Sequence, residues 1–439
     1  MMVSIASIYL VFALIGIALF RWIEPARAVA IVPVGEYPPP HAGTFPYWII
    51  GSALPSDMML VKAWVAPLAA LLGGLAFAPA RWRSYRFHPL DLAMLGWCMW
   101  PLAQGLFVPS TEPPPMLASA YLGGVWGAPW LLGRIYLARD EDRSTFLRVL
   151  GWLTVLLLPV AILEGVTGVS VYQWTVGPHP FVVDGADRYL GWRPIAWFEH
   201  GNQYGIWVAC AAIGALGVAQ ATFAHRRQES WLVVVILLFA MAVAAQSVGA
   251  IALMLLALGF LASGQARALG RRLAVPLACG ALVLGAVYVS GAIPAKRIAQ
   301  SALGHSAIAA MRAAGRGSLP WRISQDQKSV QIIKRDLIGG TGRWGWWASL
   351  KTRPRGLGVL VVGQFGLVGL VLAATAIVGP VVRRAIASRR GRETSRSALV
   401  MGVVVAMALL DGLLNAFLFL PAIALSGALV MTPGHRHRR

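Results

Sequence analysis

Long apolar runs recur along almost the whole chain, and they restrict its fold more than any other feature of the sequence. An α-helix of about 20 apolar residues spans the roughly 30 Å hydrocarbon core of a membrane. The runs lack the alternating pattern of membrane β-barrel strands. We therefore predict an all-α, polytopic transmembrane helical bundle, a single integral membrane domain over residues 1–439. About twelve spans are expected, near residues 3–21, 59–79, 89–109, 116–137, 147–168, 203–223, 231–247, 248–263, 273–293, 356–381, 397–412 and 413–431.

The amount and sign of the charge agree with a membrane protein. Only 13% of the residues are charged, whereas a soluble domain carries about a quarter. The net charge of +21 would suggest a nucleic-acid partner for a soluble protein. In a membrane bundle the question is instead on which side each cation lies, and we expect no nucleic acid.

Basic residues between the predicted spans indicate a topology, because cytoplasmic loops of membrane proteins are enriched in Lys and Arg. If the chain has twelve spans, the basic segments between them all fall on one side, the cytoplasmic side of a bacterial inner membrane. Both termini then lie in the cytoplasm as well. The basic segments hold Arg81, Arg83 and Arg86, then Arg139, Arg143 and Arg148, then Arg226 and Arg227, then Arg267, Arg271 and Arg272, then the loop 382–397 and the tail. Residues 231–263 and 397–431 are each read as a tight helical hairpin, or as one span with a re-entrant piece.

Three long loops then lie on the periplasmic side, at residues 22–58, 169–202 and 294–355. The last is strongly basic, with twelve Lys and Arg against Asp326 and Asp336. Translocated cations suit an anionic substrate such as a diphosphate, or contact with anionic lipid headgroups. Apolar residues at helical spacing over 297–314 and 321–337 predict amphipathic helices on the membrane surface within this loop.

Aromatic residues and cysteines follow the same division into spans and loops. Tryptophans near the ends of predicted spans are typical of an interfacial aromatic belt; they include Trp22, Trp82, Trp152 and Trp231. The cysteines lie inside apolar runs without metal-ligand spacing, so we expect small buried residues. They are Cys98, Cys210 and Cys279.

One polar segment stands where the sixth predicted span begins. Residues 193–202 place Arg193, Glu199, His200 and Asn202 within ten residues at the membrane boundary. A guanidinium group binds phosphate oxygens bidentately, and His200 or Glu199 are candidate general bases for a hydroxyl group. The alternative is a helix cap beside an arginine that extends toward the interface.

A second segment begins at Arg322 and reaches the glycine turn at residues 339–342. Gly340 and Gly342 allow tight turning and close approach of the backbone to a ligand, and tryptophans follow that could stack on sugar rings. The turn is not a nucleotide fingerprint, since no strand precedes it.

A third segment, from Arg355 to Gly369, reads as an ordinary span with small residues for close packing.

Taken in order, these segments resemble the O-antigen ligase and polymerase superfamily of membrane glycosyltransferases. Its members carry an Arg nine residues before an Asn, as Arg193 and Asn202 do here. A second Arg precedes a Gly-x-Gly turn, as Arg322 precedes Gly340 and Gly342, and Gly366-Leu-Val-Gly369 matches a later glycine-rich helix. The resemblance covers about residues 185–375 and implies a fold similar to that of the GT-C glycosyltransferases.

Two departures from the family pattern bear on the activity. Ser247-Val-Gly-Ala250 has Val248 where the family has Arg. The positions of the ligases' His-Asn pair hold Arg355 and Gly356. The missing His favours a polymerase over a ligase.

The resemblance implies a periplasm-facing enzyme that polymerises undecaprenyl-diphosphate-linked oligosaccharide repeats into exopolysaccharide or O-antigen. Arg193 and Arg322 would stabilise the diphosphate leaving group, with His200 or Glu199 as base. We expect substrate contacts from Asn202, Gly340, Gly342, Arg343, Arg355 and Arg188, and no metal or other cofactor. Expected partners are the lipid-linked glycan, membrane lipid, and a chain-length regulator and flippase of the same pathway.

Besides a non-catalytic assembly partner, which would tolerate loss of Arg193 and Arg322, two rival functions remain open. One is a ligase that transfers finished glycan to a lipid or protein acceptor. The other, from a different class, is a transporter or flippase, although the internal repeat typical of those folds is not visible in the sequence. Three more polar residues lie in or near spans, and we assign them to helix packing or to a substrate or proton pathway: Glu164, Asp411 and Asn415.

Overall fold

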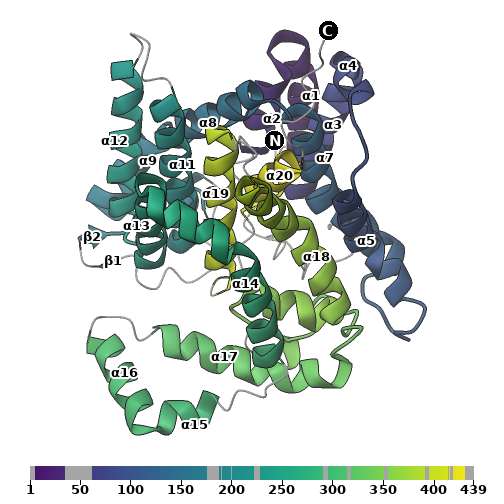
Figure 1. The fold of residues 1–439 in the computed structure, drawn as a ribbon, viewed down its shortest axis with the longest axis vertical. Coiled ribbons are helices and arrows are strands. Elements are labelled where there is room, and N and C mark those ends of the chain that lie inside the picture. The colour runs from purple at the N-terminus through teal and green to yellow at the C-terminus, as the bar shows by residue number, and fades with distance from the viewer. Residues whose placement is uncertain are drawn as a thin grey trace.

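The computed structural model describes residues 5–34, 62–175, 187–188, 190–198, 200–221, 228–289, 295–313, 318–350, 354–390, 395–413, 415 and 419–430. This part of the chain is mostly helical (Figure 1). Its strands are β1 (Asp187–Arg188) and β2 (Gly191–Trp192), which pair antiparallel with Arg188 opposite Gly191. The helices are α1 (Ile5–Trp22), α2 (Pro25–Val34), α3 (Lys62–Phe77), α4 (Pro79–Arg83), α5 (Pro89–Gln104), α6 (Pro115–Leu122), the π-helical η1 (Gly123–Gly127), α7 (Ala128–Tyr136), α8 (Asp140–Val155), α9 (Leu158–Thr167), α10 (Val171–Thr175), α11 (Gly201–Ala221), α12 (Gln228–Ala244), α13 (Val248–Ala262), α14 (Gly264–Val289), α15 (Ala295–Gln300), α16 (Ala302–Ala313), α17 (Ser318–Ile333), the 3-10 turns η2 (Lys334–Asp336) and η3 (Ala348–Leu350), α18 (Leu357–Arg389), α19 (Arg396–Gly412) and α20 (Leu420–Leu429).

A helix occupies each of the twelve predicted spans, so the all-helical prediction is confirmed at this level. Four stretches are long and apolar enough to cross a membrane by length and composition: Asp140–Thr167, Gly201–Ala219, Gly264–Gly285 and Leu357–Arg389. Shorter apolar helices of the described chain are Tyr9–Trp22, Ala63–Phe77, Trp231–Ala244 and Val248–Ala262. The count of twelve crossings stays a prediction.

Guanidinium groups gather at one end of the bundle, which we call the basic end, and bind the exposed carbonyls where helices stop there. Arg143 Nη2 donates to Ala138 O (2.6 Å) after α7 and to Ala428 O (3.3 Å) in α20, and Arg384 Nε donates to Leu429 O at 2.9 Å. The last carbonyls of a helix have no partner within it and carry partial negative charge, so cations stabilise them. The basic end also holds Arg81, which pairs with Asp142 at 2.9 Å, and Arg134, which pairs with Asp91 at 2.8 Å.

The helices α1 and α3 run parallel, which the predicted topology did not anticipate. A Cβ built on Gly16 of α1 lies 3.4 Å from Ala69 Cβ of α3, and one built on Gly73 of α3 lies 2.7 Å from Phe20 Cδ2 of α1. A later residue of α1 thus contacts a correspondingly later residue of α3, as parallel helices require. Phe20 contacts Tyr136, whose hydroxyl accepts a hydrogen bond from Trp82 at the basic end. The C-terminus of α1 therefore lies at the basic end, and its start points the other way.

The reversal comes from α2, which lies inside the predicted periplasmic loop 22–58. This helix turns back from α1 and is buried in the bundle, since Ala28, Val29 and Ala30 have no exposed surface. It packs against α3 and α8. Residues 25–34 of the predicted loop are therefore a buried helix, and the periplasmic location of 22–58 stays a prediction. The even span count with both termini on one side does not fit this arrangement of α1, α2 and α3.

Two predicted boundaries near the C-terminus also change. α18 continues to Arg389, so the predicted cytoplasmic loop 382–397 begins as helix. The segment from Arg355 to Gly369, which the sequence indicated as an ordinary span, is interrupted within α18 at Gly366, whose φ is 67°. Within the described residues of the span predicted over 413–431, the helix is α20, Leu420–Leu429. The amphipathic helices predicted in the loop 294–355 correspond to α15, α16 and α17, which lie together at the bottom of Figure 1, opposite α4.

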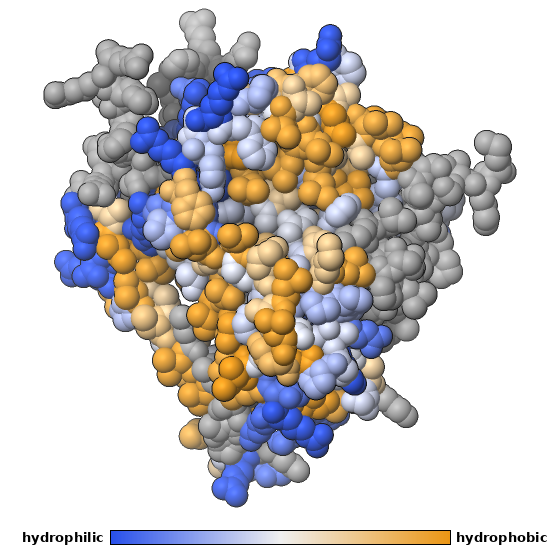
Figure 2. Space-filling model, turned by 90° about the vertical axis from the view of Figure 1, so that its right-hand side faces the viewer, coloured by the Kyte–Doolittle hydropathy of each residue, from blue (hydrophilic) through white to orange (hydrophobic). Residues whose placement is uncertain are grey.

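The surface carries the apolar side chains expected of a bundle in lipid. Figure 2 shows a broad apolar area on one face with hydrophilic groups at its upper and lower margins. Large exposed side chains such as Leu256 and Leu284 belong to α13 and α14. Cys98 and Cys210 are buried as predicted, but Cys279 is exposed on α14. Trp22 and Trp152 are exposed, as in an interfacial belt, whereas Trp231 is buried and donates to Ala215 O at 2.9 Å.

The parallel arrangement of α1 and α3 predicts the side on which the start of α1 lies. In a variant with Cys279→Ala, one cysteine is introduced before Ile5, at Arg343 or at Arg83, and a membrane-impermeant maleimide is applied to sealed cells and to inverted vesicles. We expect the cysteine before Ile5 to react from the same side as Arg343→Cys, because α1 ends at the basic end, where Arg83 is exposed. Labelling from the side of Arg83→Cys would contradict the arrangement.

Candidate functional site

The segment that carries Arg193 is held by a buried carboxylate. Glu164 in α9 accepts the backbone N–H groups of Val171 (2.9 Å), Ile195 (2.7 Å) and Ala196 (2.5 Å). Ala196 has a φ of 52°, a conformation that costs free energy in a residue with a Cβ. Three charge-assisted hydrogen bonds to one carboxylate stabilise this turn. From the sequence, Glu164 was only a polar residue in or near a span. In the structure its carboxylate holds the segment after Arg193 through the backbone N–H groups of Ile195 and Ala196.

Arg193 points inward and is 5% exposed. Its Nε donates to Ala245 O at 2.9 Å, and its Nη2 donates to Asn202 Oδ1 at 2.7 Å in the first turn of α11. A Cβ on Gly201 would lie 2.2 Å from Arg193 Nε, so the glycine makes room for the guanidinium group. The predicted pair Arg193 and Asn202 is thus in direct contact.

The turn between α12 and α13 forms the neighbouring wall. Gln246, with a φ of 50°, accepts Leu190 N–H at 3.1 Å and donates to Gly191 O at 3.3 Å, so it holds the β1–β2 ribbon. Ser247 Oγ donates to Asn202 Oδ1 at 3.4 Å. The segment that resembles the family's Ser-Arg-Gly-Ala therefore lies at the site, with Val248 40% exposed.

Arg322 reaches the same group of polar side chains from α17. Its Nη1 donates to Asn415 Oδ1, and Asn415 Nδ2 donates to Asp411 Oδ1 at 2.7 Å in α19. Asn202 Nδ2 lies 3.4 Å from Asn415 Oδ1. A continuous hydrogen-bond chain therefore joins Arg193 to Arg322 through the two asparagines. We call Arg193, Asn202, Arg322, Asp411 and Asn415 the arginine–asparagine cluster.

Asp326, one turn after Arg322, fixes the start of α18 beside this cluster. Its Oδ1 accepts the backbone N–H of Arg355 at 2.6 Å, and a Cβ on Gly356 would lie 2.8 Å from Leu413 O. Burial raises the pKa of the Asp326 carboxyl, while the hydrogen bonds from the N–H groups of Arg355 and Gly356 and the nearby charges of Arg355 and Arg322 oppose that rise. The Arg355 guanidinium stacks 4.6 Å above the Trp321 ring. Arg355 therefore lies next to the cluster.

The predicted glycine turn serves another contact. Gly340 and Gly342 have φ values of 79° and 67°, and the N–H groups of Thr341 and Gly342 donate to Gly363 O and Gln364 O at 3.0 Å each. A Cβ on Gly340 would lie 2.3 Å from Gly366 N. The close approach expected toward a ligand is made here to the broken part of α18.

Gln104 and Ser110 add further hydrogen bonds around the glycine turn. Gln104 Nε2 donates to Gly339 O (2.6 Å) and Gln364 O (2.7 Å), and exposed Arg343 donates to Ser110 Oγ at 2.7 Å. Gly366 is ten residues beyond Gly356, about 15 Å along a helix. The glycine turn therefore supports the kink of α18, and the roles predicted for Gly340, Gly342 and Arg343 in binding substrate stay predictions.

His200 caps α11. Its Nδ1 accepts the backbone N–H of Asn202 at 3.0 Å, and its carbonyl accepts Gln203 N–H at 2.8 Å. An accepting Nδ1 leaves the proton of a neutral imidazole on Nε2, so neither nitrogen is set to receive a hydroxyl proton in this arrangement. Glu199 and the side chain of Arg188 lie outside the described residues.

The described residues form no group of three or more His, Cys, Asp or Glu side chains suited to a metal ion. No family model, no curated protein and no solved structure matches the chain. The resemblance drawn from the sequence therefore enters the interpretation below only as a proposal.

Replacing Glu164 tests how the Arg193 segment is held. Glu164→Gln keeps the shape but turns an NH₂ group toward backbone N–H donors, so we expect a loss of about 1–3 kcal/mol in the free energy of unfolding. Thermal unfolding of the protein in detergent measures this. Glu141→Gln, at an exposed glutamate of α8, is the matched control and should change little. Equal effects of the two substitutions would contradict the supporting role of Glu164.

His200 can be tested as a cap separately from its imidazole chemistry. Asn is a good N-cap residue and Ala is a poor one. We expect His200→Ala to lower the free energy of unfolding by about 1 kcal/mol and His200→Asn to stay within a few tenths of the wild type. Thermal unfolding of both variants gives the comparison, and equal destabilisation by Asn and Ala would exclude the capping role.

Proposed function

We propose that this chain is a membrane glycosyltransferase that elongates a polyprenyl-diphosphate-linked glycan at the arginine–asparagine cluster. The proposed location is a bacterial inner membrane, with the cluster on the periplasmic face. The observation that carries the proposal is the hydrogen-bond chain from Arg193 to Arg322, two residues 129 positions apart that the sequence resemblance had paired by order alone.

Charge and exposure suggest a division of work between the two arginines. Arg193 is almost fully buried and orients Asn202, so it acts as a positioning residue. Arg322 and Arg355 are half-buried on either side of Asp326 and belong to the strongly basic region before α18. A departing diphosphate gains negative charge, and preorganised guanidinium groups stabilise that charge most where water is excluded. In the proposed enzyme, Arg322 and Arg355 therefore contact the diphosphate.

The proposed reaction needs three events. The acceptor hydroxyl oxygen forms a bond to the anomeric carbon, the bond from that carbon to the diphosphate oxygen breaks, and the electron pair leaves with the diphosphate. The hydroxyl proton passes to a carboxylate, either Glu199, predicted from the sequence, or Asp411, which accepts a hydrogen bond from Asn415 in the cluster. His200, engaged as a helix cap, is the less suitable base.

Two other functions have different expected outcomes. A ligase would carry finished glycan to a lipid or protein acceptor, and its loss leaves long unattached chains, whereas loss of a polymerase leaves single repeats. Arg355 and Gly356 at the positions of the ligase His-Asn pair favour the polymerase. A transporter or flippase would move the lipid-linked unit without altering its length. A flippase and a chain-length regulator are the expected partners of a polymerase.

Substitution of Arg322 gives the direct test. Purified protein is incubated with polyprenyl-diphosphate-linked repeat units, and polymer length is measured on gels. Removing one preorganised cation is expected to lower the transfer rate on the order of 10²–10³-fold, so Arg322→Ala should leave mostly single repeats. Arg193→Ala should also lose transfer, together with some thermal stability, because its guanidinium group is buried.

The matched control is Arg335→Ala, an exposed arginine that follows α17 in the same basic region. Polymer length should be unchanged in this variant. Unchanged length in Arg322→Ala, with folding verified by thermal unfolding, would remove the cluster as the site of transfer. If a strain that lacks this protein accumulates finished glycan chains that are not attached to an acceptor, the ligase function would be favoured instead.

A further inference from the structure

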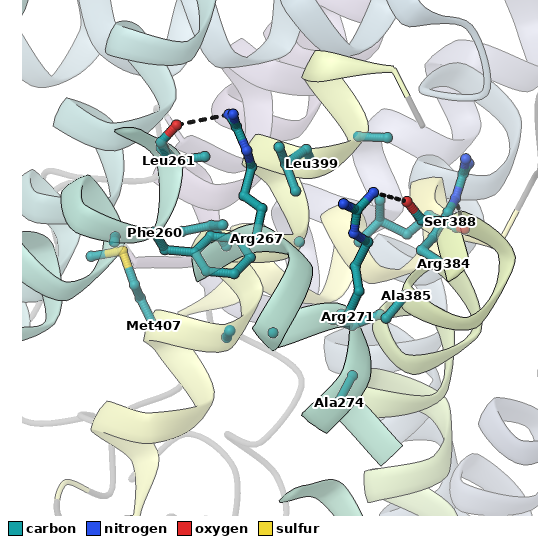
Figure 3. Close-up of a pocket in the computed structure, with 18 of the residues that line it drawn as sticks. Phe260, Leu261, Arg267, Arg271, Ala274, Arg384, Ala385, Ser388, Leu399 and Met407 are labelled. Atoms are coloured by element: carbon teal, nitrogen blue, oxygen red, sulfur yellow. Dashed lines mark hydrogen bonds between the residues drawn. The ribbon is translucent and has the colours of Figure 1, made fainter. Parts of the chain in front are cut away.

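A cavity lies among the helices that meet at the basic end, with its cationic side turned away from the arginine–asparagine cluster. It has a volume of about 770 Å³ and is formed by α13, α14, α18 and α19, with Leu429 of α20 at its margin. Figure 3 shows the guanidinium groups of Arg267, Arg271 and Arg384 toward one side of the cavity and Ala274 and Met407 toward the other. The cavity is therefore polar and cationic at one side and apolar in its remainder.

The cationic side coincides with the helix ends. Arg267 and Arg271 lie in the first two turns of α14, Arg384 lies near the end of α18, and Arg396 begins α19. No aspartate or glutamate is among the described residues that line the cavity. Four arginines from three helices thus surround a space without a lining carboxylate, which is complementary to an anion.

Arg267 and Arg271 retain donors for such an anion. Arg267 Nη1 donates to Leu261 O at 2.9 Å, and Arg271 Nη1 donates to Ser388 Oγ at 3.1 Å. A guanidinium group has five N–H donors, and among the described residues these contacts use one of the five in each case. The unused donors can bind phosphate oxygens without breaking a contact in the protein.

The apolar walls extend from this end into the bundle. They are lined by Leu253, Leu256 and Phe260 of α13 and by Leu399, Val403 and Met407 of α19. From Arg396 to Leu410, the last lining residue of α19, the wall measures about 21 Å along a helix. One leaflet of a bilayer has about half of the roughly 30 Å hydrocarbon thickness. The depth is therefore enough for the acyl chains of one leaflet.

We propose that this groove binds an anionic phospholipid. Arg267 and Arg271 hold its phosphate at the basic end, and its acyl chains lie along α13 and α19. Charge complementarity selects an anionic lipid over a zwitterionic one, and the long apolar wall selects a lipid over a soluble phosphate. The cationic side of the groove is at the opposite end of the bundle from the proposed transfer reaction, and its apolar wall ends at Leu410, next to Asp411. The proposal does not depend on that reaction.

Native mass spectrometry of the full chain in detergent tests the proposal. The protein is titrated with phosphatidylglycerol, with phosphatidylcholine of the same acyl chains, and with soluble glycerol phosphate. We expect the wild type to retain phosphatidylglycerol at least fivefold more than phosphatidylcholine and to bind no glycerol phosphate. Arg267→Gln with Arg271→Gln should lower phosphatidylglycerol binding roughly tenfold or more, because each arginine near an anionic headgroup contributes about 1 kcal/mol.

Two further variants separate lipid binding from general effects of charge and folding. Arg83→Gln with Arg86→Gln removes the same charge from exposed positions at the basic end and should leave binding unchanged. Gly402→Leu places a side chain in the groove, and a Cβ at Gly402 meets no atom closer than 4.0 Å. Binding of both lipids should fall in this variant, with its folding verified by thermal unfolding.

Several outcomes would overturn the proposal. Equal retention of the two lipids, or equal losses in the two double variants, would exclude a charge-selective site. Binding of glycerol phosphate as tight as that of the lipid would indicate an anion site without acyl chains. A dimer that Gly402→Leu dissociates would assign the groove to a second copy of the chain.

Discussion

The hydrogen-bond chain from Arg193 through Asn202 and Asn415 to Arg322 is the contact on which the arrangement of the site depends. It joins the segment before α11, the start of α11, the end of α19 and α17, which are widely separated in the sequence. Inside an apolar bundle a polar side chain without a partner costs several kcal/mol, so each member of the chain requires the next. The same requirement explains Glu164, whose carboxylate takes three backbone N–H groups of the segments around it. The positions of the loops are therefore set by polar contacts, whereas apolar packing sets the positions of the helices.

Much of the helical architecture could be predicted, because a span is visible as a continuous apolar run. The helix α2 could not, since its ten residues are shorter than a span and include Pro25 and Pro33. Its burial comes from small residues, Ala28 and Ala30 among them, which carry little hydropathy but allow close packing against α3 and α8. The break at Gly366 was also hidden, because the glycine turn that satisfies its neighbours' carbonyls lies more than 20 residues earlier in the chain.

For the candidate site, only short-range relations could be predicted. Arg193 and Asn202 are nine residues apart, and their contact follows from a segment that turns into the start of α11. The contact between Arg322 and Asn415 spans 93 residues, and nothing in hydropathy or residue spacing determines it. Asp411 and Asn415 were expected in or near a span, but their hydrogen bond to each other and their connection to the arginines are visible only in the tertiary structure. The glycines were correctly expected to allow close approach, although the group that approaches them here is backbone of the same chain.

The arginines of the bundle have carboxylate partners in some places and amide partners in others, with different consequences for their charge. At the basic end Arg81 and Arg134 pair with Asp142 and Asp91, so opposite charges cancel within a few ångströms. At the cluster, Arg193 and Arg322 donate to the amide oxygens of Asn202 and Asn415. An amide oxygen satisfies an N–H donor but leaves the guanidinium charge in place, whereas a carboxylate neutralises it. Amide partners fix the two guanidinium groups without neutralising them, so in the proposed enzyme Arg193 can orient Asn202 while Arg322 keeps its attraction for the diphosphate.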